Sequence, residues 1–156
     1  MRLAPLAALM ASAFDADAFM STSFSEATAT TVMPVPPGDY VALIEDVKAR
    51  QAKDSTVLDV VWNIDDPAVK EKLGRTKVTV RQSVFLDFNE SGGLAFGEGK
   101  NVQLGRLRKA VNQNTAGQPW QPMMLKGQGA KIKVTHRIDK DTGITYDQVS
   151  AVAPLG

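Results

Sequence analysis

The sequence has 156 residues, of which 44% are hydrophobic, and its 18 Lys and Arg against 17 Asp and Glu leave a net charge of +1. This length fits one domain with a sizeable core plus a tail. The absence of cysteine and the single histidine, His136, exclude a disulfide framework, a thiolate or multi-His metal site and a Cys nucleophile, so we expect neither a metal nor a cofactor.

The charge is distributed unevenly along the chain. Between Lys72 and Arg137, twelve Lys and Arg stand against three acidic residues, a local charge of +9, whereas the flanks hold most of the acidic residues. A basic middle of this kind is typical of proteins that bind polyanions.

Residues 1–33 are expected to form a flexible N-terminal extension. Arg2, the apolar stretch Leu3–Met10 and the tripeptide Ala11–Ala13 follow the pattern of a short secretory signal. We favour a second interpretation, in which Met20 opens a small polar segment typical of cytosolic proteins and the residues before it are an extension or an upstream start. No stretch approaches the roughly 18 apolar residues of a membrane span, so we expect a cytoplasmic protein without membrane contact.

The folded domain is expected over residues 34–156 and opens with a turn rich in Pro and Gly at 34–38. Strands are predicted over residues 39–50 and 57–65. In the second strand, apolar residues recur at every other position, which places them on one face. These residues are Leu58, Val60, Trp62 and Ile64.

A short helix is predicted over residues 67–73, because Asp66 suits the N-cap, Pro67 the first helical position and Gly74 the end. The third strand, over residues 75–88, shows the clearest alternation. One face holds Thr76, Val78, Val80, Gln82, Val84 and Leu86, and the other holds Lys77, Thr79, Arg81, Ser83 and Phe85.

The glycine-rich residues 89–100 predict a loop, and an amphipathic helix is expected over residues 102–111. The inward residues of this helix are Val102, Leu104, Leu107 and Val111. After a short apolar segment, strands are predicted over residues 130–139 and 144–152, joined by a hairpin turn in which Gly143 tolerates positive φ.

The main elements are therefore three strands, a helix and two strands. This order predicts a mainly β protein, an OB-fold-like five-stranded Greek-key barrel with one helix between the third and fourth strands. A small β-sandwich with a helix is the competing architecture.

Two of these strands carry basic residues on their polar faces. In the third strand, one face holds Lys77, Arg81 and Phe85. In the fourth strand, one face holds Lys131, Lys133 and Arg137, and the opposite face holds the apolar residues Ile132, Val134 and Ile138. A plain solvated face usually mixes Lys with Glu, but no acidic residue interrupts either set. A basic groove that holds an aromatic suits a phosphate backbone with stacked bases, so we prefer a nucleic-acid interface to a solvated face.

Further candidate contacts lie between these two strands. They are Phe88, Phe96, Lys100, Arg106 and Arg108. The two phenylalanines flank the glycine-rich loop, where an exposed ring can stack on a base. The helix cations either extend the basic surface or solvate the helix. Trp62, Trp120 and His136 are expected to be structural, with Trp120 closing the end of the barrel.

Motifs for catalysis are weak. Gly97–Lys100 resembles part of a phosphate loop, but Leu94 and Asn101 stand where that motif needs Gly and Ser or Thr. The carboxylate pairs, Asp65 with Asp66 and Asp139 with Asp141, adjoin predicted turns, where Asp acts as a cap. We expect no enzyme; a metal-dependent nuclease is the enzymatic alternative.

Several segments resemble a family of small bacteriophage single-stranded DNA-binding proteins with a Pro-x-Gly-x-Tyr opening. The similar segments are Val35–Tyr40, Leu58–Ile64, Lys72–Lys77, Leu104–Arg108, Leu125–Gly127 and Tyr146–Val149. The resemblance spans residues 34–154 and implies an OB-like fold and a role in phage replication or recombination, in the host cytoplasm. The acidic C-terminal tail of many such proteins is missing, because residues 151–156 contain no acid.

We therefore expect sequence-tolerant binding of single-stranded DNA by a homodimer or higher oligomer, with other phage replication or recombination proteins as further candidate partners. The alternative is a structural or assembly protein of a virion, which would use residues 1–33 for subunit contacts.

Overall fold

The computed structural model describes residues 13–156, so the signal-like stretch Leu3–Met10 lies outside the described residues. The chain divides between Val32 and Met33 into two units. In the first unit, a short helix α2 (Ala16–Met20) is capped by Asp15, whose carboxylate accepts hydrogen bonds from the backbone N–H groups of Asp17 and Ala18. The flexible arm predicted there thus contains one helical turn.

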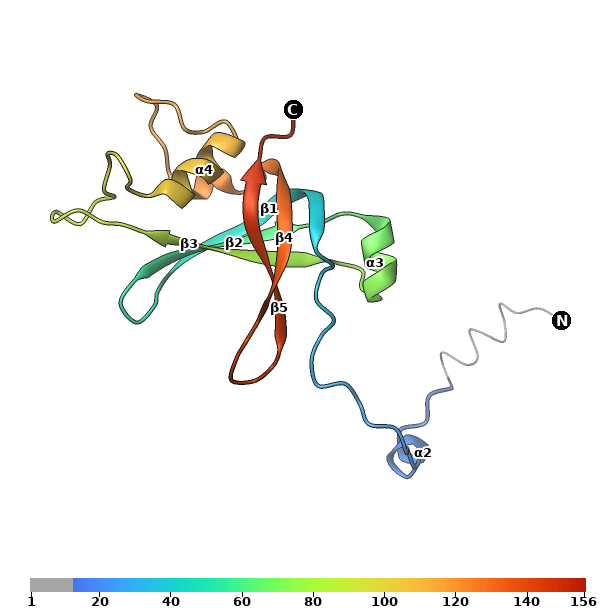
Figure 1. Cartoon of the computed structure of the whole chain (residues 1–156). Coiled ribbons are helices and arrows are strands. Elements are labelled where there is room, and N and C mark those ends of the chain that lie inside the picture. Colours follow the sequence, from blue (N-terminus) through green and yellow to red (C-terminus); the bar gives the residue numbers. More distant parts are fainter. Residues whose placement is uncertain (1–12) are drawn as a thin grey trace. The chain divides into compact units, whose positions relative to one another are not determined.

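Five antiparallel strands form a single sheet in the second unit, in the order β3-β2-β1-β4-β5 (Figure 1). The strands are β1 (Gly38–Gln51), β2 (Thr56–Asn63), β3 (Thr79–Leu86), β4 (Gly129–Ile138) and β5 (Thr145–Ala153). The expectation of a mainly β protein with five strands is confirmed. Hydrogen bonds do not join the edge strands β3 and β5, so the sheet is open, although their Cα atoms come within 8 Å of each other.

The first strand belongs to both halves of the sheet. Its N-terminal part, from Gly38 to Leu43, pairs with β4, and its C-terminal part, from Leu43 to Gln51, pairs with β2. A bulge at Glu45 separates the parts, and bulges increase the local twist of a strand. β1 therefore connects two halves of the sheet, one formed by β3 and β2 and the other by β4 and β5.

The helices of this unit lie near opposite ends of β3 (Figure 1). Helix α3 (Pro67–Leu73) precedes β3 and has the predicted caps: Asp66 accepts from the N–H of Ala68, and Gly74 ends the helix at φ 65°. Helix α4 (Val102–Ala110) follows β3, and the 3-10 turn η1 (Pro122–Leu125) precedes β4. None of the helices within residues 13–156 has the length and apolar character needed to cross a membrane.

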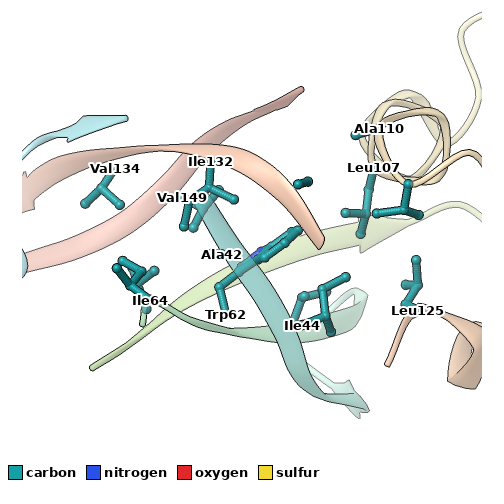
Figure 2. Packing of buried hydrophobic residues seen from close by; sticks show 14 of the residues in the cluster. Ala42, Ile44, Trp62, Ile64, Leu107, Ala110, Leu125, Ile132, Val134 and Val149 are labelled. Carbon is teal, nitrogen blue, oxygen red and sulfur yellow. The ribbon is translucent and has the colours of Figure 1, made fainter. Parts of the chain in front are cut away.

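The core is built on the alternating apolar residues of the strands, covered by α4 and η1. Trp62 is fully buried, and Figure 2 shows its ring beside Ala42 and Ile44 of β1. Its indole Nε1–H donates to Oε1 of Gln82, at 2.9 Å, which explains how the amide of Gln82 is buried on the inward face of β3. Leu107 and Leu125 approach the core from α4 and η1 (Figure 2).

Three details differ from the sequence prediction. β3 begins at Thr79 rather than at residue 75, because its partner β2 ends at Asn63, which pairs with Thr79. Val102, predicted to face inward, is 45% exposed at the first residue of α4. Ile138 is also exposed, since the β4–β5 hairpin extends past the core. Trp120 is half-buried and packs against the core, as expected of a structural residue.

The start of the domain is fastened to the last two strands. The N–H of Val35 donates to the carboxylate of Asp147, at 2.7 Å, and the carbonyl of Val35 accepts from Nε2 of His136, at 2.6 Å. The hydroxyl of Tyr40 donates to the carbonyl of Pro36. Val35 is completely buried, so the Pro-rich turn belongs to the folded unit, and His136 helps to hold it there.

Candidate nucleic-acid interface

Arg81 and Phe85 share the outer face of β3, and Lys77 is exposed two residues before the strand; we call these three predicted site residues the β3 surface. Strand pairing places Arg81 opposite Val61 and Phe85 opposite Val57 of β2. The ring of Phe85 is 56% exposed although its backbone is held in the sheet. A rigid, exposed aromatic four residues from an exposed arginine offers a base and a phosphate separate contacts.

Acidic residues from the neighbouring strands reduce the charge of the β3 surface. Nζ of Lys77 lies 2.5 Å from Oε1 of Glu45, at the bulge of β1, and Asn63 also donates to that carboxylate. The hydrogen bond from Lys77, and then that from Asn63, lower the pKa of Glu45, which is therefore ionised at neutral pH. On β2, Asp59 accepts from Nε of Arg50 at 2.5 Å and from the hydroxyl of Ser83. Arg81 of β3, in contrast to Lys77, makes no ion pair among the described residues.

A second surface, the β4–β5 surface, consists of Lys131, Lys133 and Arg137 of β4 with Tyr146 of β5. All four side chains are exposed, and none of the three cations has an ion pair within residues 13–156. The guanidinium carbon of Arg137 lies 5.1 Å from the centre of the Tyr146 ring, opposite it in the sheet. These cations are free to contact an anionic ligand.

The β4–β5 surface adjoins a shallow groove with an apolar floor. Val41 pairs with Lys131 in the sheet, and Asp39 pairs with Lys133, so the first half of β1 forms one side of the groove. Ala151 and Ala153 of β5 form the other side. The groove has a volume of about 450 Å³.

The two surfaces do not form one continuous basic strip along neighbouring strands. β2 and β1 lie between β3 and β4, which places the two basic strands three spacings apart, about 14 Å along the sheet. The sequence predicts that each set of cations lies on the polar face of its strand, but it does not predict that β2 and β1 separate the two strands. A ligand that contacts both surfaces has to cross the outer face of the sheet or the seam where β5 approaches β3.

The loop after β3 is held in place by Asn101, which sequence reasoning missed as a candidate. The side chain of Asn101 accepts from the N–H of Asp87 at 2.8 Å, and donates to the carbonyls of Asp87 and Ala95, each at 2.9 Å. Asn101 itself has φ 50°, a conformation that Asn tolerates better than most residues. The loop therefore presents Phe88, Phe96 and Lys100, which are all exposed, on a tethered backbone.

Replacing Asn101 by alanine is expected to destabilise the domain by about 1–3 kcal/mol, because three hydrogen bonds are lost from the loop. Asn112→Ala is the matched control, since Asn112 also has positive φ, at 59°, but makes no side-chain hydrogen bond among the described residues. Limited trypsin digestion after Lys100 and chemical denaturation measure the difference. Equal behaviour of the two variants would show that the side chain of Asn101 does not hold the loop.

The cations of α4 fall into two groups. Arg106 and Lys109 are exposed, as expected of a solvated helix face. Arg108 is half-buried; its Nε donates to the carbonyl of Gln113 at 3.0 Å, and its guanidinium carbon lies 4.2 Å from the centre of the Trp120 ring. Burial lowers the pKa of Arg108. Trp120 and Tyr146, each paired with an arginine, were not predicted as site residues, because the arginines approach them only in the folded chain.

Within residues 13–156, no three His, Asp or Glu side chains are grouped as a metal site requires. The candidate site thus consists of unpaired cations and exposed aromatic rings on a β-sheet. A comparison with protein-family models found no match to the sequence, and a comparison with curated proteins found none either.

Proposed function

We propose that the protein binds single-stranded DNA with little sequence preference, on the outer face of an OB-type domain. The observation that carries this proposal is the set of exposed cations that make no ion pair within residues 13–156 and share their strands with exposed aromatic rings or with an arginine stacked on one. These are Arg81 with Phe85 on β3, and Lys131, Lys133 and Arg137 with Tyr146 on β4 and β5.

The inferred OB-type architecture follows from the order of the strands. Joining β5 to β3 would close the sheet into a five-stranded Greek-key barrel with α4 between the third and fourth strands, the arrangement of an OB-fold. The long β1 with its bulge supports this inference, because it supplies both halves of the sheet. OB-folds bind oligonucleotides on the face of their second and third strands and with adjoining loops, and the β3 surface lies on this part of the sheet.

The chemistry of the two surfaces favours a single strand over a duplex. Each base that stacks on an aromatic side chain contributes about 1–3 kcal/mol, and this requires an unpaired base. Cations beside the rings contact the phosphates, and that contact does not depend on sequence. The exposed cations of α4 are Arg106 and Lys109, so this helix offers few positive charges to a duplex.

The resemblance of residues 34–154 to small phage proteins extends the proposal to phage DNA replication or recombination in the host cytoplasm. A homodimer or higher oligomer is the proposed binding unit, since one small domain contacts few nucleotides.

Binding to a fluorescent oligo-dT, measured by anisotropy at low salt with a duplex competitor, tests the proposal. We expect binding that the duplex does not displace, and a loss of about 5- to 150-fold in affinity for Phe85→Ala, the equivalent of one stacked base. The absence of binding at low salt would disprove the proposal. If duplex DNA competed equally well, the protein would instead have a general affinity for polyanions.

The second candidate function, assembly of a virion or other lattice, is favoured by the aromatic residues of the first unit. Phe14, Phe19 and Phe24 are all more than half exposed, and neighbouring rings in this series are 5.9 Å apart. An exposed aromatic cluster is a common subunit contact. Formation of a defined oligomer without nucleic acid, lost on removal of residues 1–32, would support this function.

A further inference from the structure

We propose that a pocket between the loop after β3 and the turn after α4 binds a nucleobase; the proposal rests on the proposed function and names a site for one base of the strand. The pocket is lined by Leu94 and Phe96 on the loop side, by Arg108 of α4, and by Asn114, Gln118 and Trp120 on the turn side. Its volume is about 570 Å³, within the usual range for small-molecule sites.

The walls of the pocket suit a flat, electron-rich ring. Phe96 is 79% exposed and lines the pocket from the loop. Arg108, which stacks on Trp120, lines it from the helix. Unpaired bases stack on phenylalanine rings and on the guanidinium planes of arginine. A base in the pocket would therefore have an aromatic ring and a stacked cation available as partners.

Gln113 fixes the positions of Arg108 and Trp120 before any ligand binds. Its backbone carbonyl accepts from Nε of Arg108, and its side-chain Oε1 accepts from Nε1 of Trp120, at 2.9 Å. Its Nε2 donates to the carbonyl of Met124, at 2.8 Å. One residue, through its backbone carbonyl and its side chain, therefore joins the helix, the turn and η1, so that the arginine and the tryptophan lose little freedom when a ligand arrives.

The polar groups of the pocket match the edge of a base. The amides of Asn114 and Gln118 each present a donor and an acceptor, as base edges do, so the pair can bond to several bases. Lys100 and Arg108 line the adjoining hollow beneath Phe96 and can contact a phosphate there. The combination of stacking partners, amides and cations identifies a nucleotide as the ligand class.

The position of the pocket relates it to the β3 surface. The backbone N–H of Phe85 donates to the side chain of Gln103 in α4, and Asn101 fastens the start of α4 to Asp87. The chain thus leads from Arg81 and Phe85 on β3, through the tethered loop, to Phe96. A strand that stacks on Phe85 can place a base further along its length in this pocket.

Tryptophan emission during titration with dTMP and with a dT pentamer tests the proposal, since Trp62 is fully buried and Trp120 is not. We expect both ligands to quench the emission, and Trp120→Phe to abolish the change. Phe96→Ala should weaken dTMP binding about 5- to 150-fold, the equivalent of one stacked base. Phe24→Ala, which removes an exposed phenylalanine from the first unit, is the matched control and should leave binding unchanged.

The outcomes separate this site from the proposed function. If the pentamer binds by anisotropy but neither ligand changes the emission and Phe96→Ala binds normally, the pocket proposal is wrong and single-strand binding stands. If dTMP quenches Trp120 but the pentamer binds no better than dTMP, the pocket holds a nucleotide and the single-strand function fails. If neither ligand binds, both proposals are wrong.

Discussion

Replacing Trp62 by alanine is expected to destabilise the domain by about 3–5 kcal/mol, the range for removing a large aromatic side chain from a core. Trp62 is fully buried on β2, opposite Ile44 of β1 and Val80 of β3, so the loss leaves a cavity that three strands enclose. The substitution also leaves the amide oxygen of Gln82 without the indole N–H that donates to it. A buried acceptor without a partner adds to the cost.

Urea denaturation followed by circular dichroism measures this effect without relying on tryptophan emission. Two variants separate its causes. Trp62→Phe keeps a ring in the core but removes the hydrogen bond to Gln82, and is expected to cost about 1–3 kcal/mol. Trp120→Ala removes a half-buried ring at the edge of the core and should cost less than Trp62→Ala. A loss below about 1 kcal/mol for Trp62→Ala would contradict a core centred on this residue.

The second large effect is the dependence of DNA affinity on salt concentration. If Arg81, Lys131, Lys133 and Arg137 each neutralise one phosphate, the logarithm of the affinity for oligo-dT should fall with the logarithm of salt with a slope of about −2.8, since each single-strand phosphate contributes about −0.7. Affinity should then fall about 50-fold between 50 and 200 mM salt. This steep dependence arises because each cation that replaces a condensed counterion releases it to the solution.

The double variant Lys131→Ala/Lys133→Ala is expected to halve this slope, to about −1.4, because two of the four contacts are lost. Lys72→Glu is the matched control: it changes the net charge by the same two units, but on the exposed surface of α3, outside the β4–β5 surface. Anisotropy titrations at four salt concentrations give the slopes. An equal change for both variants would mean that net charge alone, and not the β4–β5 surface, attracts the DNA.

Local sequence patterns predicted the elements of this fold well. Alternation at period two placed Trp62, Val80 and Ile132 on the buried face, because successive side chains of a strand point to opposite sides whatever surrounds it. The caps of α3 were also predictable, since Asp66 and Gly74 act within one helical turn. The errors lie at element ends, such as Thr79 and Val102, where the partner strand or the covering layer ends and the pattern has no information about either.

The candidate site was predictable only in part. The exposure of Arg81, Phe85, Lys131 and Lys133 follows from the same alternation. The ion pair of Lys77 with Glu45 does not, because the two residues are 32 positions apart and meet through the bulge of β1 and the pairing of β1 with β2 and β2 with β3. A residue without acidic neighbours in sequence can therefore have one in space.

The sequence by itself thus determined which residues face the core and which carry the positive charge, since both follow from the geometry of a single strand or helix. Only the tertiary structure decided which cations remain unpaired, that β2 and β1 separate the two basic strands, and that Arg108 stacks on Trp120 beside Phe96. These relations depend on strand order, register and bulges, which are properties of the whole sheet and are set by packing between distant segments.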